Sequence, residues 1–148
     1  MSKPAELSYE TTLLVRDHCL CLHMQRAARA VARRFDAAFR PLNLTNGQFS
    51  LMMSLNRPVP PPVGAVASLL AMDRTTLTAA LKPLARRGLV EVRPDPKDKR
   101  SRLLGLTPEG RELLARALPI WDETHTAVEA LLRKGAPPRL REELRALS

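Results

Sequence analysis

Residues 62–107 decide the fold of this chain. They read PVGAVASLLAMD (62–73), RTTLTAALKPLARRG (74–88), LVEVR (89–93), PDPKDKRS (94–101) and RLLGLT (102–107). The first two segments have the apolar spacing of helices, and LVEVR and RLLGLT alternate as strands do. Two helices with a short turn between them, followed by a hairpin, predict a mainly α protein with a small antiparallel β-hairpin.

The first helix and the turn after it are marked by ordinary helix signals. Apolar residues follow the spacing i, i+3, i+4, i+7, at Val63, Val66, Ala67 and Leu70. Pro62 suits the first helical position. Residues 71–73 make a short turn, and Asp73 is a suitable N-cap for the next helix.

The second helix places its apolar and polar residues on opposite faces. Its core side carries Leu77, Leu81 and Leu84, and Gly88 ends it in a position that tolerates a left-handed backbone. Pro83 removes one backbone hydrogen bond, but the leucine spacing continues across it, so we expect a helix with a bend.

The face of this helix opposite the leucines is positive. Thr75, Ala79, Lys82 and Arg86 lie there, Arg74 and Thr78 flank it, and no acidic residue occurs between Arg74 and Arg87. Insertion into the major groove of DNA needs such a face. A solvated basic helix face is the common alternative.

The hairpin has a basic tip. Residues 94–101 separate the two strands, and the prolines at its start forbid a helix. A hairpin of this kind directly after a recognition-type helix is a wing, which reaches the DNA backbone or the minor groove.

Several short motifs in order resemble the signature of MarR-family winged-helix transcription regulators. They are MDRTTLT (72–78), LKPL (81–84), RGLV (87–90), DPKDKR (95–100) and LTPEG (106–110). The similarity begins at Leu44, and the flanking helices fit the same plan, so it covers nearly the whole chain. The resemblance implies a dimeric winged helix-turn-helix that binds double-stranded DNA.

The wing departs from the family in one residue. The family usually has Asp-Arg-Arg where this chain has Asp98, Lys99 and Arg100. The resemblance implies that Asp98 orients a wing arginine and that Arg100 enters the minor groove, whereas Lys99 keeps the charge but loses the bidentate fork. The predicted DNA-binding residues are Arg74, Thr75, Thr76, Thr78, Lys82, Arg86, Lys97, Asp98, Lys99, Arg100 and Arg102.

Composition agrees with a nucleic-acid partner. The 148 residues are enough for one domain, and the net charge of +9 favours a polyanion. No apolar stretch is long enough to span a membrane, residues 1–10 do not form a signal peptide, and two cysteines fit a reducing cytoplasm. We expect a cytoplasmic protein without a cofactor or a membrane partner.

The two ends of the chain read as long amphipathic helices. Ser8 is expected to cap a helix that runs to about Arg40, and Thr107 one that runs from Pro108 to about Lys134 with a kink at Pro119. A short helix follows, with leucines at 140, 144 and 147. The regions 8–40 and 108–148 are predicted to dimerise the protein, and 45–107 to form the DNA-binding lobe within a single domain of residues 1–148.

Reactive side chains concentrate in the segment HCLCLH (18–23). Cys19 and His23 are helical neighbours, but two ligands do not make a structural zinc site, and no metal site is predicted. On a continuous helix Cys19 and Cys21 point about 200° apart, too far to form a disulfide within one chain. Burial is the ordinary role of such cysteines, and a thiol that senses oxidants is the alternative.

The sequence therefore predicts a regulator and not an enzyme, because it has no nucleophile turn and no phosphate-binding glycine motif. We expect a homodimer that represses transcription at a palindromic operator. The resemblance implies release by a small-molecule effector, often an aromatic acid, with Cys21, His23, Arg26 and Phe49 as candidate pocket residues. The alternatives are an oxidant sensor of the same fold, acting through Cys19 or Cys21, and a non-specific architectural DNA-binding protein.

Overall fold

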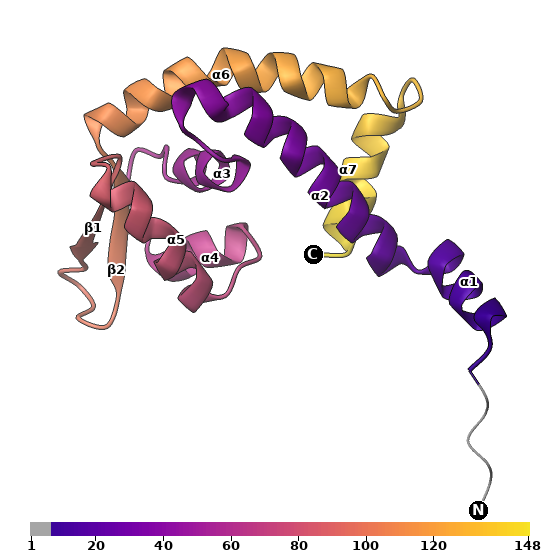
Figure 1. Cartoon of the computed structure of the whole chain (residues 1–148). Helices are drawn as coiled ribbons and strands as arrows, with labels where there is room; N and C mark the ends of the chain where they lie inside the picture. The colour runs from indigo at the N-terminus through magenta and orange to yellow at the C-terminus, as the bar shows by residue number, and fades with distance from the viewer. Residues whose placement is uncertain (1–6) are drawn as a thin grey trace, which may run out of the picture. The chain divides into compact units, whose positions relative to one another are not determined.

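The computed structural model describes residues 7–148 (Figure 1). The chain divides into two compact units, one that ends at Arg34 and one from Phe35 to Ser148. The first unit holds α1 (Tyr9–His18) and most of α2 (Leu20–Phe39). The second unit continues with a 3₁₀ turn (Arg40–Leu42), α3 (Asn46–Ser54), α4 (Val63–Leu69), α5 (Arg74–Arg86), β1 (Val90–Pro94), β2 (Arg102–Leu106), α6 (Pro108–Glu129) and α7 (Ala136–Ala146).

The single long helix predicted for residues 8–40 is wrong in one respect, because it is interrupted at Cys19. Ser8 does cap α1, accepting a hydrogen bond from the Thr11 N–H at 3.3 Å. Cys19 is extended (φ −71°, ψ 108°), and its Sγ accepts from the Leu22 N–H at 3.4 Å. The thiol thus takes the place that a capping oxygen has at the start of a helix.

The core of the second unit is built from the apolar faces that the sequence marks. Fully buried side chains come from α2, α3 and the residue after it, α4, α5 and β2, and they include Phe39, Met52, Leu55, Val66, Leu77, Leu84 and Leu104. A capping box starts α3: Thr45 Oγ1 accepts from the Gln48 N–H, and Gln48 Oε1 accepts from the Thr45 N–H. The leucine face of α5 is also confirmed as buried.

Helices α4 and α5 form the predicted helix-turn-helix (Figure 1). Asp73 caps α5 as expected, with its Oδ1 2.7 Å from the Thr76 nitrogen, and this bond to the main chain lowers the pKa of the Asp73 carboxyl. Ala71 takes a positive φ of 52° in the turn. The helix continues through Pro83 as predicted. Pro62 is the N-cap of α4 and not its first helical residue, which corrects the expectation by one position.

The wing is an antiparallel pair that runs from Val90↔Leu106 to Pro94↔Arg102. The first strand begins one residue later than predicted, because the Leu89 N–H still bonds to the Leu84 carbonyl at the end of α5. Gly88 has the expected positive φ, 70°. The connector before α4 also joins the sheet, since the Leu104 N–H donates to the Pro61 carbonyl at 2.9 Å.

Helix α6 starts where the sequence predicts but ends earlier. Thr107 Oγ1 accepts from the Gly110 N–H at 3.0 Å and donates to the Gly88 carbonyl at 2.6 Å. The predicted end near Lys134 is wrong, because α6 stops at Glu129. The N–H groups of Leu131 and Leu132 bond to carbonyls three residues earlier, so the last turn is tightened. Gly135, at φ 80°, then starts α7.

Candidate nucleic-acid interface

The exposed face of α5 carries the predicted cations. Lys82 and Arg86 are exposed, while Leu77, Leu81 and Leu84 hold the opposite face in the core. No acidic side chain lies between Arg74 and Arg87 to neutralise this face. The helix is therefore fixed by its apolar side and presents its positive side to solvent.

The three predicted threonines differ in what their hydroxyls do. Thr76 Oγ1 donates to Asp73 Oδ2 at 2.7 Å, and Thr78 Oγ1 donates to the Arg74 carbonyl at 2.8 Å. Within residues 7–148 the Thr75 hydroxyl makes no hydrogen bond to protein. Thr75 is thus the threonine with both its donor and its acceptors available to a base edge.

Arg74, the first residue of α5, lies over α4. A Cβ placed on Gly64 would be 2.6 Å from Arg74 Nη2, so the guanidinium occupies the space that a side chain at position 64 would need. No local pattern in the sequence singles out Gly64. Its role is visible only when α4 and α5 are packed together.

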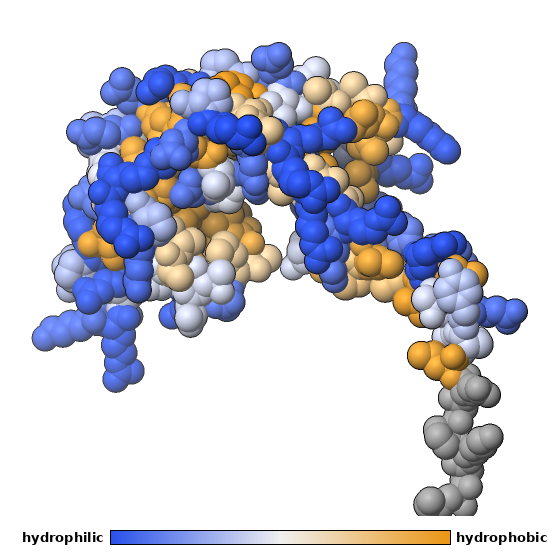
Figure 2. Space-filling view, in the orientation of Figure 1, coloured by the Kyte–Doolittle hydropathy of each residue, from blue (hydrophilic) through white to orange (hydrophobic). Residues whose placement is uncertain are grey.

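The wing tip is shaped by two aspartates. Asp95 Oδ1 accepts from the Lys97 N–H at 2.9 Å, and Asp98 Oδ1 accepts from the Arg100 N–H at 3.0 Å. We expected Asp98 to hold the Arg100 guanidinium, but the hydrogen bond goes to the main chain of Arg100. Lys97, Lys99, Arg100 and Arg102 are all exposed, and Figure 2 shows hydrophilic side chains projecting from the end of the hairpin.

Arg87 forms hydrogen bonds within the protein. Its Nη1 donates to the Asn43 carbonyl at 2.6 Å and its Nη2 to the Leu42 carbonyl at 3.4 Å. These bonds tie the end of α5 to the turn before α3. Arg87 therefore differs from Arg86, which has no such partner within the described residues.

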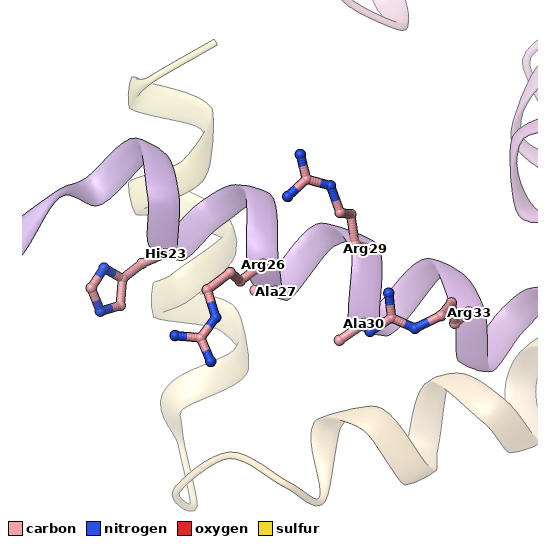
Figure 3. A pocket seen from close by; sticks show the side chains of 6 residues that line it. All are labelled: His23, Arg26, Ala27, Arg29, Ala30 and Arg33. Carbon is pink, nitrogen blue, oxygen red and sulfur yellow. The ribbon is translucent and has the colours of Figure 1, made fainter. Parts of the chain in front are cut away.

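The four candidate effector residues fall into two groups. His23 and Arg26 line a hollow along α2 together with Arg29 and Arg33 (Figure 3), whereas Phe49 is buried at the edge of an apolar pocket in the second unit. Cys21 is exposed, and its Sγ accepts from Gln25 Nε2 at 3.0 Å. Their roles as effector contacts stay predictions.

The two cysteines are both free thiols. Cys19 lies half-buried at the interruption between α1 and α2. Because the helix is interrupted at Cys19, Cys19 and Cys21 do not share the continuous helix on which the expected separation of about 200° depends. Oxidant sensing by Cys19 or Cys21 stays a prediction.

Comparison with known proteins agrees with this geometry. A family model described as "MarR family" matches residues 44–101, from the start of α3 to the wing tip. The structure of the transcriptional regulator MosR of M. tuberculosis in complex with DNA has a TM-score of 0.80 and 35% identity, over 88% of this chain and 93% of that chain. The chain belongs to the MarR family. The resemblance seen in the motifs is thereby confirmed.

Other MarR-type relatives carry regulator names as well. The transcriptional repressor CouR, bound to a DNA duplex, has a TM-score of 0.79 and 28% identity, over 97% of this chain and 99% of that one. The transcriptional regulator HosA of Escherichia coli O111:H- is 36% identical over 54% of this chain and 59% of its own length. The aligned part thus spans less than two thirds of HosA. Within residues 7–148 no helix of this MarR-family chain combines the length and the apolar character that crossing a bilayer requires.

Proposed function

We propose that this MarR-family protein is a dimeric transcription regulator that binds double-stranded DNA at a palindromic operator. One observation carries the proposal: the acid-free positive face of α5 and the basic wing tip belong to the same compact unit, fixed on one core. DNA complexes of MosR and CouR, which have the same fold, support it. Because such a protein acts on the genome, we also propose a cytoplasmic location.

The contacts divide by the chemistry that each side chain offers. Thr75 and Arg74 at the start of α5 are proposed for base edges in the major groove, and Lys82 and Arg86 for phosphates. The cations of the wing tip reach the backbone, and the planar guanidinium of Arg100 suits a narrow minor groove better than a strongly hydrated ammonium.

Exposed apolar side chains support the homodimer. Leu131 and Leu147 are 65% and 62% exposed in the single chain, and Leu118, Leu140 and Leu144 are exposed as well. Exposed leucines concentrated on α6 and α7 and just beyond the ends of these helices indicate an interface. A two-fold dimer would place two α5 helices about one DNA turn apart, ~34 Å, and so read a palindrome.

The dimer is tested by light scattering at micromolar concentration. The full chain should have twice the mass of one protomer, and a chain without residues 1–30 and 135–148 should lose the dimer. A well-folded full-length monomer, or a dimer that survives both deletions unchanged, would contradict the assignment of the end helices.

Repression that is relieved by a small molecule is the proposed mode of regulation. It follows the expectation for the family, and the two hollows described above give it candidate places in the chain. An effector that binds the free protein more tightly than the DNA-bound protein would weaken DNA binding. The loss of DNA affinity would equal the ratio of the two effector affinities.

The specific-binding proposal is tested against architectural binding by competition. A duplex footprinted in the promoter region of the adjacent operon is bound, and excess random duplex is then added at constant salt. Specific binders prefer their site over random DNA by a factor of roughly 10³–10⁷. We therefore expect the complex to persist at a thousandfold excess of random duplex. If the complex is lost in proportion to the random DNA added, the protein binds DNA without sequence specificity.

Asp98 provides a prediction about the wing. Asp98→Ala should weaken operator binding several-fold although it removes a negative charge, because the turn that presents Arg100 loses its hydrogen bond to the main chain. Asp98→Asn keeps an acceptor oxygen for the same bond, so it should bind at least as tightly as wild type.

Titrations of the three proteins on one operator at several salt concentrations decide between the roles of Asp98. If Asp98→Ala binds more tightly than wild type, Asp98 is only a repulsive surface charge near the phosphates. Arg100→Lys serves as the companion variant, since it should weaken specific binding while the salt slope stays nearly unchanged.

A further inference from the structure

Gly64, in the first turn of α4, leaves a notch that the side chain of Arg74 fills. A Cβ built at position 64 would lie 2.6 Å from Arg74 Nη2, 3.3 Å from its Cζ and 3.6 Å from its Nε. These are the three nearest atoms, and all of them belong to one side chain. The guanidinium therefore occupies a space that any larger residue at position 64 would close.

The direction of the Arg74 side chain follows from its place in α5. Arg74 is the first residue of that helix, and side chains on a helix lean toward its N-terminus. Arg74 therefore leaves α5 at its N-terminal end and reaches α4. The N-terminal residues of a recognition helix are those that meet base edges in the major groove, so Gly64 lies behind a side chain that is placed for a base contact.

The Arg74 guanidinium has no partner of its own in the protein. The neighbouring Asp73 uses Oδ1 to accept from the Thr76 N–H and Oδ2 to accept from the Thr76 hydroxyl, both at 2.7 Å. Among the residues that the structure describes, only Thr78 forms a side-chain hydrogen bond to Arg74, and it goes to the main-chain carbonyl. A cation at the start of a helix is also disfavoured by the helix dipole. The five N–H donors of Arg74 thus stay available to a ligand.

The helices around the notch are held more firmly than the arginine. Val66 and Ala67 of α4 and Leu77 of α5 are buried in the core, and the Met72 N–H donates to the Ala67 carbonyl at 2.9 Å across the turn. A methyl group at position 64 would therefore move the flexible guanidinium and leave α4 and α5 in place.

We propose that Gly64 is a positioning residue for DNA reading: it sets the direction of the Arg74 guanidinium, which selects one guanine in each half of the operator. Arginine recognises guanine through two parallel hydrogen bonds to O6 and N7, so the result depends on the angle at which the planar fork approaches the base. The inference rests on the proposed function and deepens it, because it names the base that Arg74 selects and the residue that directs Arg74.

The first measurement compares affinities for two duplexes, one that wild type enriches from a random-sequence library and one of random sequence. Gly64→Ala should bind the enriched duplex at least about fivefold more weakly than wild type, the smallest loss typical of one broken arginine–guanine pair. It should bind the random duplex as wild type does, with the same salt slope, because the number of neutralised phosphates does not change.

A double-mutant cycle shows whether position 64 acts through Arg74. In an Arg74→Ala protein, Gly64→Ala should cause no further loss of affinity for the enriched duplex, because no guanidinium is left to displace. If Gly64→Ala causes the same loss in both backgrounds, its effect runs through the packing of the helices, and the proposal is wrong.

Thermal denaturation of the free protein separates positioning from folding. Gly64→Ala should melt within about 2 °C of wild type or above it, since only a movable side chain is in the way and alanine favours a helix over glycine. A protein that melts well below wild type would mean that the helices, and not the arginine, absorb the added methyl group, which would also overturn the proposal.

The selected sequences identify the base. Wild type should enrich a guanine at one position of each half-site, and Gly64→Ala should lose that guanine while the rest of the palindrome remains. Arg74→Lys, which keeps the charge without the fork, should lose the same guanine. Gly47→Ala is the control, because its Cβ meets nothing within 4 Å, and it should enrich the wild-type sequence.

The outcomes distinguish this proposal from the proposed function. If wild type enriches a palindrome and Gly64→Ala enriches the same guanine with the same affinity, Gly64 does not direct Arg74, although the protein remains a specific DNA binder. If the wild-type library stays random, both the proposed function and the role of Gly64 are refuted.

Discussion

A Lys82→Glu, Arg86→Glu double variant is expected to bind operator DNA on the order of a hundredfold more weakly than wild type, about 2.7 kcal/mol. Both side chains are exposed on α5, and neither belongs to the buried leucine face. Two attractive contacts with phosphate become repulsive, and the salt slope should fall by about two phosphates. Fluorescence anisotropy of a labelled operator at several salt concentrations gives both quantities.

The matched control has the same change in net charge elsewhere. Arg116→Glu with Lys134→Glu alters two exposed cations outside α5 and the wing, and should reduce affinity by less than fivefold. Circular dichroism should show both proteins folded. Equal losses in the two double variants would mean that net charge, and not the face of α5, governs DNA binding.

Gly110→Ala is expected to destabilise the fold more than the addition of a methyl group at any other glycine. A Cβ at position 110 would lie 2.1 Å from the Leu89 carbonyl oxygen, which is main chain and cannot rotate away. That carbonyl also accepts the Thr107 N–H at 3.1 Å, so a shift would disturb the junction of α5, the wing and α6. Overpacking of this kind typically costs about 1–3 kcal/mol, or roughly 2–12 °C in Tm.

Gly47→Ala provides the comparison, since a Cβ at position 47 meets nothing within 4 Å. This variant should melt within about 2 °C of wild type or slightly above it, because alanine favours helix. Thermal denaturation of both variants is the measurement. A Gly110→Ala protein as stable as wild type would show that the contact of α6 with Leu89 is looser than described.

The helix-turn-helix and the hairpin after it were predicted well because their signals are local. The caps at Asp73 and Thr107 and the leucine face of α5 depend on residues three or four apart, and all are found in the structure. The family resemblance added the roles of the wing residues. The ends of elements were less predictable. The start of β1 depends on the bond from the Leu89 N–H to the Leu84 carbonyl, and the end of α6 depends on the N–H groups of Leu131 and Leu132, which bond three residues back.

Other features depend on contacts that no local pattern contains. The interruption at Cys19 arises from a thiol that accepts a main-chain hydrogen bond, a weak role that is not read from residue type. The packing of Arg74 over Gly64 and the pairing of Glu129 with Arg141 join residues from different helices. Asp98 is predicted to act in the wing, but its bond to the Arg100 main chain depends on how the wing turn folds.

If the positive face of α5 reads DNA in a two-fold dimer, the protein must select a palindromic sequence. Selection of bound duplexes from a random-sequence library, followed by sequencing, tests it most directly. We expect an enriched palindrome whose half-sites are centred about 10 base pairs apart, one helical turn. A library that stays random after selection, or a single half-site without its symmetric mate, would contradict the account.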